Sequence, residues 1–337
     1  MKAALLRSPT DIVIEEVPMP IFSKDQVLVQ ISHMGICGTD LKIFNGDIPA
    51  ALPVVMGHEA IGKIVEGSGI DGSTRGDQVI IDPVLYCGEC FFCNKNDTHL
   101  CENGGLLGRD VNGVFAEFIQ VPASNVFSLD HKVDPDVAPL IQVMTTVLHA
   151  QVRADIQKGE VVVVLGLGVT GLLQVQVAKA LGAKKVIGVS RNAYKRNLAI
   201  KMGANEVSDH GEEAKSKILQ LTEGRGADVV IEAVGYISVL AEAMDILRIG
   251  GRIIPFGIYA ELTGELPFYE FYFKELNIIN ARAALPEDFP KSINLVETGK
   301  VELEPLITHV RSFEKLNEAL QILMEPNNER LKVMLKF

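Results

Sequence analysis

The feature that most constrains the fold is a glycine-rich turn placed between a strand and a helix. Gly166-Leu-Gly-Val-Thr-Gly171 follows the uninterrupted apolar run Val161–Leu165 and opens a segment of helical character. A GxGxxG pattern alone is weak, but a strand before it, a helix after it and a second strand ending about 20 residues on make it specific for dinucleotides. Its glycines permit a tight turn and close approach of the pyrophosphate to the helix N-terminus. We expect the cofactor to contact this turn, that is, Gly166, Leu167, Gly168, Val169, Thr170 and Gly171.

The residues after this turn continue to alternate between predicted strands and helices. Apolar strands are expected at 185–189, 228–233, 252–256 and 276–279, and helices at 171–181 and 193–202. Buried strands that alternate with helices indicate a parallel sheet covered on both faces. We therefore predict a doubly wound parallel sheet of the Rossmann type.

The first third of the chain is instead β-rich. Residues 11–17 and 26–31 alternate apolar and polar side chains, residues 114–121 are a further strand candidate, and glycine and proline break the segments often. Short strands joined by turns favour an irregular barrel. A helix over 140–154 is a candidate hinge between the two parts. The tail beyond Arg282 leaves the alternation, with a helix over 313–324 and a strand over 331–337.

Four of the five cysteines form one cluster. Cys87, Cys90, Cys93 and Cys101 are separated by two, two and seven residues. Short spacings let one loop wrap a metal, and four thiolates suit tetrahedral zinc with no open coordination position. We predict a structural zinc site. Reduced surface cysteines or an iron–sulfur cluster are the alternatives.

A second set of zinc-ligand residue types lies upstream. Cys37-Gly-Thr-Asp40 ends an apolar strand, and Gly57-His58-Glu59 follows twenty residues after Cys37. Cysteine and histidine ligate zinc, and a carboxylate beside the histidine can ligate or orient. Each fragment alone is weak, but their pairing upstream of a four-cysteine loop predicts a second, open zinc site.

Taken together, these motifs resemble the zinc-containing medium-chain dehydrogenases of alcohols and polyols, over essentially the whole chain. The resemblance implies a GroES-like irregular β-barrel catalytic domain, residues 1–143 completed by 283–337, and a dinucleotide-binding Rossmann domain, residues 144–282. It also implies hydride transfer between NAD(P) and an alcohol, polyol or sugar-derived hydroxyl, with reaction in a cleft between the domains. A non-catalytic or altered-specificity relative with a weakened zinc site is the alternative.

The resemblance assigns roles to individual residues. Cys37 and His58 would bind the catalytic zinc with Glu59 as a third or exchanging ligand, Asp40 would hold the His58 imidazole, and Thr39 would carry the substrate hydroxyl proton. Thr145 would contact the cofactor.

Two positions depart from the family pattern. Gln142 stands where relatives usually place Glu, Asp or Cys, so either it hydrogen-bonds the zinc water and leaves three protein ligands, or the metal is held weakly; we favour the first. Lys42 stands where many relatives carry the outer histidine of a proton relay, and a charged lysine cannot accept a proton at neutral pH.

The end of the second parallel strand bears on the cofactor. NAD-preferring enzymes carry an acid there for the ribose 2′-hydroxyl, whereas this chain has Ser190-Arg191. Serine can donate to a 2′-phosphate and arginine can pair with it, so we predict NADP over NAD.

The substrate is less constrained. Arg282 matches a position that contacts substrate in polyol-type relatives, which suggests a polyhydroxylated or anionic substrate; a salt bridge is the alternative. Phe44 and Asn45 are further candidates for the pocket.

Charge and hydropathy exclude other classes. The net charge is −11, no basic cluster is present and no run of 18 apolar residues occurs, so we expect neither nucleic-acid binding nor a membrane span. The first residues do not read as a signal peptide, and we expect a cytoplasmic protein. Relatives suggest a homo-oligomer, a tetramer or dimer. A zinc-free quinone or enoyl reductase would lack both metal clusters.

Overall fold

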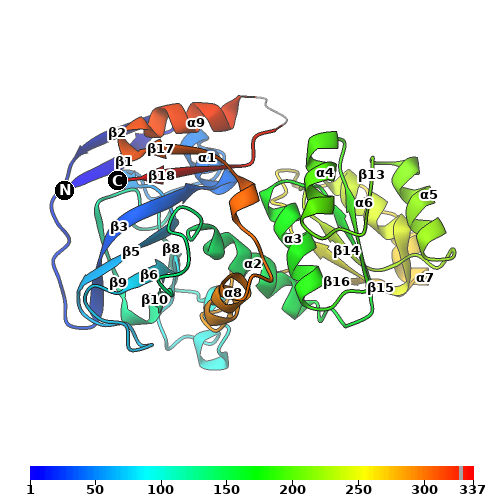
Figure 1. The fold of residues 1–337 in the computed structure, drawn as a ribbon, viewed down its shortest axis with the longest axis horizontal. Coiled ribbons are helices and arrows are strands. Elements are labelled where there is room, and N and C mark those ends of the chain that lie inside the picture. The colour runs from blue at the N-terminus through cyan, green and yellow to red at the C-terminus, as the bar shows by residue number, and fades with distance from the viewer. Residues whose placement is uncertain (326–328) are drawn as a thin grey trace. The chain divides into compact units, whose positions relative to one another are not determined.

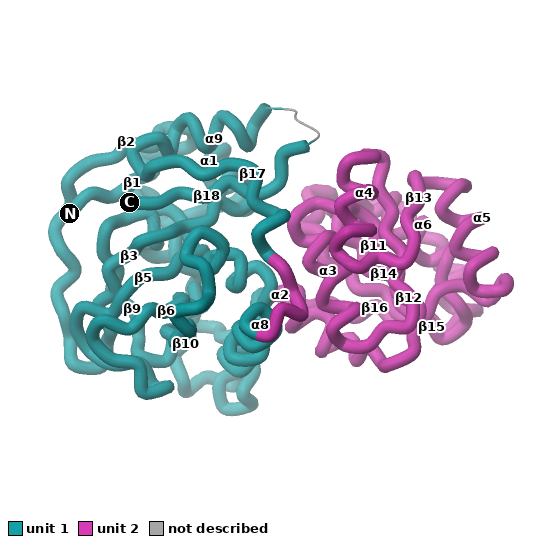
Figure 2. Tube along the Cα trace, in the orientation of Figure 1, with its two compact units in different colours: residues 1–145, 283–297, 303–337 teal, residues 146–282, 298–302 magenta. Residues whose placement is uncertain are grey.

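The computed structural model describes residues 1–325 and 329–337, which form two compact units (Figures 1 and 2). The first comprises residues 1–145, 283–297 and 303–337, and the second comprises residues 146–282 and 298–302. The first boundary lies two residues beyond the expected one, and 298–302 fall in the second unit.

The first unit is built mainly from antiparallel strands. Its largest sheet has the order β10-β6-β5-β3-β18-β17, with β9 also paired to β3, and a second sheet has the order β2-β1-β4. The strands are β1 (Lys2–Ser8), β2 (Asp11–Glu16), β3 (Gln26–Ile36), β4 (Val54–Val55), β5 (Glu59–Glu66), β6 (Gln78–Ile81), β7 (Val84–Leu85), β8 (Gly105–Leu106), β9 (Phe118–Pro122), β10 (Val126–Ser128), β17 (Ile307–Ser312) and β18 (Lys332–Lys336). Its helices are α1 (Gly38–Asn45), α8 (Asp288–Glu297) and α9 (Leu316–Met324), and α2 (Leu140–Arg153) crosses the boundary between the units.

The core of this unit joins both ends of the chain. Phe115 and Met56 are fully buried in it together with Phe313 and Leu335 from the C-terminal segment. β18 pairs antiparallel with β3, which inserts the last strand beside the strand that leads to Cys37 (Figure 1). The C-terminal residues therefore complete the sheet on which the open zinc cluster is built.

The second unit is a six-stranded parallel sheet with the order β13-β12-β11-β14-β15-β16. Its strands are β11 (Val161–Leu165), β12 (Lys185–Val189), β13 (Glu206–Ser208), β14 (Ala227–Glu232), β15 (Leu247–Pro255) and β16 (Asn277–Ile278). Its helices are α3 (Val169–Ala180), α4 (Ala193–Lys201), α5 (Glu212–Leu221), α6 (Ile237–Ile246) and α7 (Phe268–Phe273). Figure 1 shows α3 and α4 on one side of the sheet and α5 and α6 on the other. The predicted doubly wound parallel sheet is confirmed.

Some predicted elements differ in extent. The strand expected at 114–121 begins only at Phe118, because Val114 and Phe115 donate backbone hydrogen bonds to Gly57 and Met56 in an irregular crossing. The tail holds a helix, α8, and a strand, β17, that the sequence pattern did not predict.

Candidate active site

The open zinc cluster lies in the first unit. Cys37 precedes α1 directly after β3, and His58 and Glu59 stand at the start of β5, the strand paired with β3. One ligand atom from each of the three side chains lies within 4.8 Å of the others. His58 and Glu59 are buried while Cys37 is half-buried. A soft thiolate, an imidazole and a carboxylate gathered this closely fit a zinc ion.

Asp40 fixes two members of this cluster. Its Oδ2 accepts a hydrogen bond from the Cys37 backbone N–H at 2.7 Å, and its Oδ1 lies 3.0 Å from His58 Nδ1. Asp40 is fully buried. A carboxylate this close to Nδ1 favours the proton on that nitrogen and leaves the Nε2 lone pair for a metal, which is the usual support of a zinc-bound histidine.

The electrostatics favour a cation at His58. Burial alone lowers the pKa of the imidazole, but the Asp40 carboxylate and then Cys37 raise it well above its ordinary range. The negative charges that favour a proton on the ring equally favour a metal cation in its place.

The residue before His58, Gly57, has a backbone conformation and packing that only glycine can adopt. Its φ is +91°, and a Cβ at this position would lie 2.3 Å from Phe115 Cδ1. Gly108 and Gly113 also pack closely against the Gly57 backbone, since a Cβ on either would come within 2.5 Å of the Gly57 carbonyl oxygen. Only glycine fits both the left-handed backbone and this packing.

The other residues predicted around this cluster lie in the same unit. Thr39 is half-buried in the first turn of α1, and Lys42 lies in its last turn. Gln142 is buried on α2 with an exposed fraction of 8%. Phe44 belongs to the hydrophobic core at 8% exposure, so of the predicted pair only Asn45 is exposed.

The four-cysteine cluster is a compact loop. The Sγ–Sγ separations are 3.5 Å for Cys90–Cys93 and Cys87–Cys101, 3.8 Å for Cys90–Cys101 and 4.0 Å for Cys87–Cys93. Four sulfurs at about 2.3 Å from a tetrahedral zinc would be about 3.8 Å apart. The Cys87 backbone N–H also points at Cys101 Sγ, at 3.3 Å. The thiol positions fit zinc.

The glycine turn joins β11 to α3 as predicted. Gly166 has φ +92°, and a Cβ on Gly171 would lie 1.9 Å from the Gly166 carbonyl oxygen. A Cβ on Gly168, which precedes α3, would meet no atom within 4 Å, so space is left above the helix N-terminus. Strand order reverses between β11 and β14, and this switch point is where doubly wound sheets bind their ligands.

The end of β12 carries Ser190 and Arg191. Arg191 is exposed, and Ser190 Oγ accepts a hydrogen bond from the Asn192 backbone N–H. Arg196, one turn into α4, donates to the Ser190 carbonyl and pairs with Asp209 at 3.0 Å. The Asp209 carboxylate thus already compensates the charge of Arg196. The Arg191 side chain, in contrast, is exposed at the end of β12.

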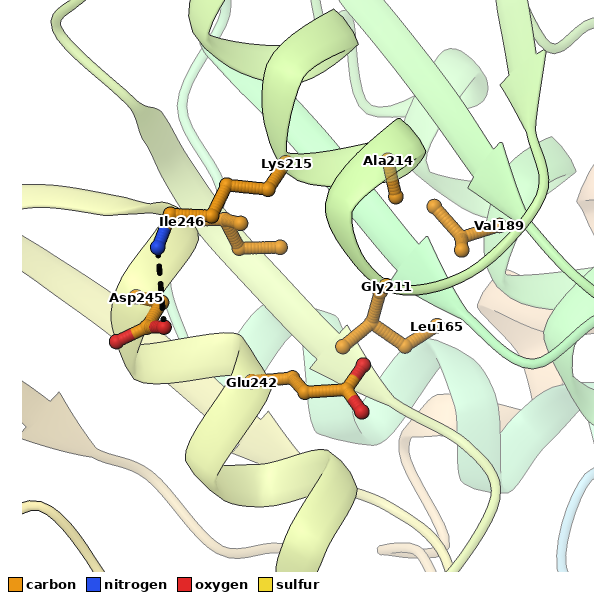
Figure 3. Close-up of a pocket in the computed structure, with 8 residues that line it drawn as sticks. All are labelled: Leu165, Val189, Gly211, Ala214, Lys215, Glu242, Asp245 and Ile246. Atoms are coloured by element: carbon orange, nitrogen blue, oxygen red, sulfur yellow. Dashed lines mark hydrogen bonds and ion pairs between the residues drawn. The ribbon is translucent and has the colours of Figure 1, made fainter.

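A small pocket lies beside the ends of β11 and β12 (Figure 3). Leu165 and Val189, the residues just before the glycine turn and Ser190, form one wall, and α5 and α6 form the other with Ala214 and Ile246. Glu242 and the ion pair between Lys215 and Asp245 stand at its edge.

The remaining predicted residues are placed as follows. Arg282 is exposed at the end of the second unit. Thr145 is buried, and its hydroxyl donates to the Ile141 carbonyl oxygen at 2.7 Å. Sequence reasoning missed Lys332, whose ammonium contacts the Glu59 carboxylate. It also missed Glu232, which accepts hydrogen bonds from the Val234 and Gly235 backbone and from the Tyr259 hydroxyl at the switch point.

Comparison with known proteins gives the family. Residues 23–131 match an alcohol dehydrogenase GroES-like domain, and residues 169–298 match a zinc-binding dehydrogenase domain. The chain is 32% identical to a sorbitol dehydrogenase of Halalkalibacterium halodurans over 326 residues, which cover 96% of this chain and 94% of that one. The chain belongs to the zinc-containing medium-chain alcohol and polyol dehydrogenase family. The GroES-like and Rossmann fold class predicted from the sequence is thereby confirmed.

Two solved structures extend the likeness to three dimensions. A protein of Sinorhizobium meliloti described as a zinc-binding dehydrogenase, bound to NADP, superposes with a TM-score of 0.92 and 29% identity over 100% of this chain and 99% of its own. A short chain alcohol dehydrogenase of Escherichia coli complexed with NADH gives a TM-score of 0.93 and 29% identity over the same shares. This dehydrogenase is a zinc-dependent oxidoreductase that transfers hydride between NAD(P) and an alcohol or polyol.

The same comparisons leave the predicted alternative, a non-catalytic relative, without support. In residues 1–325 and 329–337, no helix has the length and apolar character needed to cross a membrane. The expectation that the protein acts on a small molecule agrees with the family.

Proposed function

We propose that the enzyme oxidises a polyol or sugar-derived alcohol with NADP, using a catalytic zinc held by Cys37, His58 and Glu59. This proposal rests on the three-residue cluster, in which one ligand atom from each side chain lies within 4.8 Å of the others. His58 and Glu59 are buried, and Cys37 is half-buried. Bound there, zinc would supply a Lewis acid that polarises the substrate oxygen. Cys87, Cys90, Cys93 and Cys101 would hold a second, structural zinc.

The chain's own groups would prepare the reaction. Asp40 holds His58 in one tautomer and orientation through Nδ1. The Thr39 hydroxyl would accept the proton of the substrate hydroxyl while it gives its own proton to the cofactor ribose, and from there to water. Gln142 adds a neutral carboxamide and no third negative charge, which leaves a coordination position for substrate.

Zinc analysis of the purified chain tests this ligand set. We expect about two zinc ions per chain, one for each cluster. About one zinc per chain, with the four-cysteine loop intact, would favour a degenerate catalytic site.

The cofactor preference is proposed from the end of β12. Arg191 is exposed there beside Ser190, and no acid occupies either position. We expect Arg191→Ala to lower kcat/KM for NADP by about 10–100-fold, because a charge-assisted hydrogen bond is worth about 1.5–3 kcal/mol, and to leave NAD nearly unchanged. Steady-state kinetics with both cofactors measure this, with Arg75→Ala, an exposed arginine of the first unit, as the control. Equal losses for both cofactors, or a wild type that prefers NAD, would contradict the assignment.

The substrate class rests on two observations. Relatives include a sorbitol dehydrogenase, and Arg282 is an exposed cation that suits a polyhydroxylated or anionic substrate. The deciding experiment is a panel of polyols, sugar acids, sugar phosphates and simple secondary alcohols, followed at the absorbance band of reduced nicotinamide. Turnover of simple secondary alcohols alone would refute the polyol assignment.

We further propose a cytoplasmic homo-oligomer, a dimer or tetramer, that associates through the second unit. All five cysteines belong to the two clusters that fit zinc, and thiol clusters of this kind are typical of a reducing compartment. The edge strand β16 lies in the same unit as an exposed aromatic group on α7. This group comprises Phe268, Tyr269, Tyr272 and Phe273, which are 60–74% exposed. Large exposed apolar patches mark interaction surfaces. A molar mass of one chain by light scattering would exclude the oligomer.

A further inference from the structure

A buried ion pair joins the first residue of β5 to the first residue of β18. Glu59 has an exposed fraction of 0% and the Lys332 side chain one of 5%, and Lys332 Nζ contacts Glu59 Oε2. The strand β3 runs between them, since the sheet order is β5-β3-β18. The two side chains therefore meet across β3.

Gly35 provides the room for this contact. It pairs with Glu59 on one side of β3 and with Met334 on the other. A Cβ at this position would lie 2.1 Å from Glu59 Oε2 and 2.8 Å from Lys332 Cε. The space above Gly35 is filled by the ion pair, so a larger residue would push the two side chains apart.

Lys332 is the main compensation for the Glu59 charge. Apart from this pair, neither Glu59 oxygen has a hydrogen-bond partner among residues 1–325 and 329–337. A buried carboxylate without a counter-charge is costly, so the sheet depends on the lysine as long as Glu59 is ionised. The same carboxylate lies within 4.8 Å of the ligand atoms of Cys37 and His58. The buried Glu59 carboxylate thus lies next to both the Lys332 ammonium and the position where a zinc ion would bind.

We propose that Lys332 is a positioning residue of the catalytic zinc site, which competes with the metal for Glu59 and prevents that carboxylate from becoming a permanent zinc ligand. The inference rests on the zinc site of the proposed function. With Lys332 nearby, the Glu59 carboxylate can exchange between two positions. The Lys332 ammonium compensates the carboxylate charge when Glu59 is away from the metal, and the metal compensates it when Glu59 is bound.

Removal of the lysine charge should act on zinc in one direction. A positive charge near a divalent cation repels it, and its loss favours the metal. The Glu59 carboxylate, left without its ammonium, would also turn to the metal for compensation. Both effects predict tighter zinc binding. A lysine that only supported the fold would have the opposite effect, because a loosened site releases zinc faster.

The test is the rate at which the zinc-loaded enzyme releases zinc to a chromogenic chelator. For Lys332→Met we expect one of the two zinc ions to leave about 10–100-fold more slowly than in wild type, the range over which groups around a metal site act. Because a carboxylate fixed on the metal would lower its power to polarise the substrate oxygen, kcat should fall more than KM changes. Lys332→Arg, which keeps the charge, should restore release close to the wild-type rate. The cobalt-substituted enzyme should show an altered visible absorption band in Lys332→Met only.

Lys336→Met is the matched control, because Lys336 lies on the same strand in an exposed pair with Asp136. It should leave zinc release unchanged. Glu59→Gln combined with Lys332→Met should abolish the slow release, since no carboxylate remains to be freed. If Lys332→Met does not fold, Lys332→Gln carries the same expectation. Release that is unchanged or faster in a folded variant overturns the proposal. If instead Cys37→Ser keeps the wild-type zinc content, the zinc site of the proposed function is itself wrong.

Discussion

Replacement of His58 by Asn is expected to reduce the zinc content by one ion per chain and to lower kcat/KM by at least about 1000-fold. His58 is buried at the centre of the three-residue cluster, and Asp40 holds its Nδ1 at 3.0 Å. Polarisation by a metal is worth several kcal/mol, and each 1.36 kcal/mol is a factor of ten, so a loss of about 4 kcal/mol corresponds to about 1000-fold. Zinc analysis and steady-state kinetics on the same preparation measure both effects.

The appropriate control is His131→Asn, because the His131 side chain is 89% exposed and lies outside both metal clusters. It should keep the wild-type zinc content and activity. The four-cysteine loop is sequence-local and contains no part of the His58 site, so its zinc should remain in both variants. A His58→Asn enzyme that retained all its zinc and most of its activity would remove this histidine from the ligand set.

Local motifs explain why much of the site could be predicted. The cysteines from 87 to 101 lie in one loop, and the glycines from 166 to 171 lie in another. Because each motif is local in sequence, the spacing of its residues predicts the geometry of the site. The pairing of Cys37 with His58 was predicted from residue types upstream of the four-cysteine loop, and the structure adds that β3 and β5, which position them, are neighbouring strands.

Lys332 could not be predicted in the same way. It reaches Glu59 only because β18 returns from the far end of the chain to pair with β3 in one register, and only because residue 35 has no side chain. A lysine at the start of an apolar strand is ordinarily solvated. Buried polar side chains of this kind depend on non-local strand order, which sequence periodicity does not contain.

The charged residues near the cofactor site show a second limit of prediction from the sequence. Ser190, Arg191 and Arg196 are close in sequence, yet Arg196 is paired with Asp209 while Arg191 is exposed. Whether a basic residue is available for a phosphate depends on a partner beyond β13, and the sequence alone does not identify that partner.

Asp228→Asn is expected to destabilise the second unit by about 2 kcal/mol at neutral pH. Asp228 lies near the start of β14, almost buried at 7% exposure. Its carboxylate accepts hydrogen bonds from the Val161 backbone at 2.8 Å, Arg225 at 2.7 Å and Arg248 at 2.6 Å. Loss of one partner of a buried ion pair costs about 3–5 kcal/mol, and we reduce that figure because Arg225 is half exposed and partly solvated.

The destabilisation should depend on pH with a definite sign. Burial raises the pKa of the Asp228 carboxyl, but the hydrogen bonds from Arg225, Val161 and Arg248 outweigh it and hold the pKa well below its ordinary range. A lowered pKa in the folded state contributes stability that is fully present above the unfolded value, about 3.9, and is lost as the pH falls toward the folded value. The gap between wild type and Asp228→Asn should therefore be constant from neutral pH to about pH 5 and narrow below about pH 4.

Thermal or denaturant unfolding across this pH range measures the gap, and about 2 kcal/mol corresponds to about 4–8 °C for a unit of this size. Asp245→Asn is the matched control, because Asp245 forms an exposed pair with Lys215 in the same unit, and exposed pairs contribute less than about 1 kcal/mol. A gap that widened toward acid pH would mean that Asp228 is protonated in the folded enzyme. A gap no larger than that of Asp245→Asn would mean that the two arginines find equal compensation in solvent, and the ion pairs at the start of β14 would then not stabilise the sheet that carries the cofactor turn.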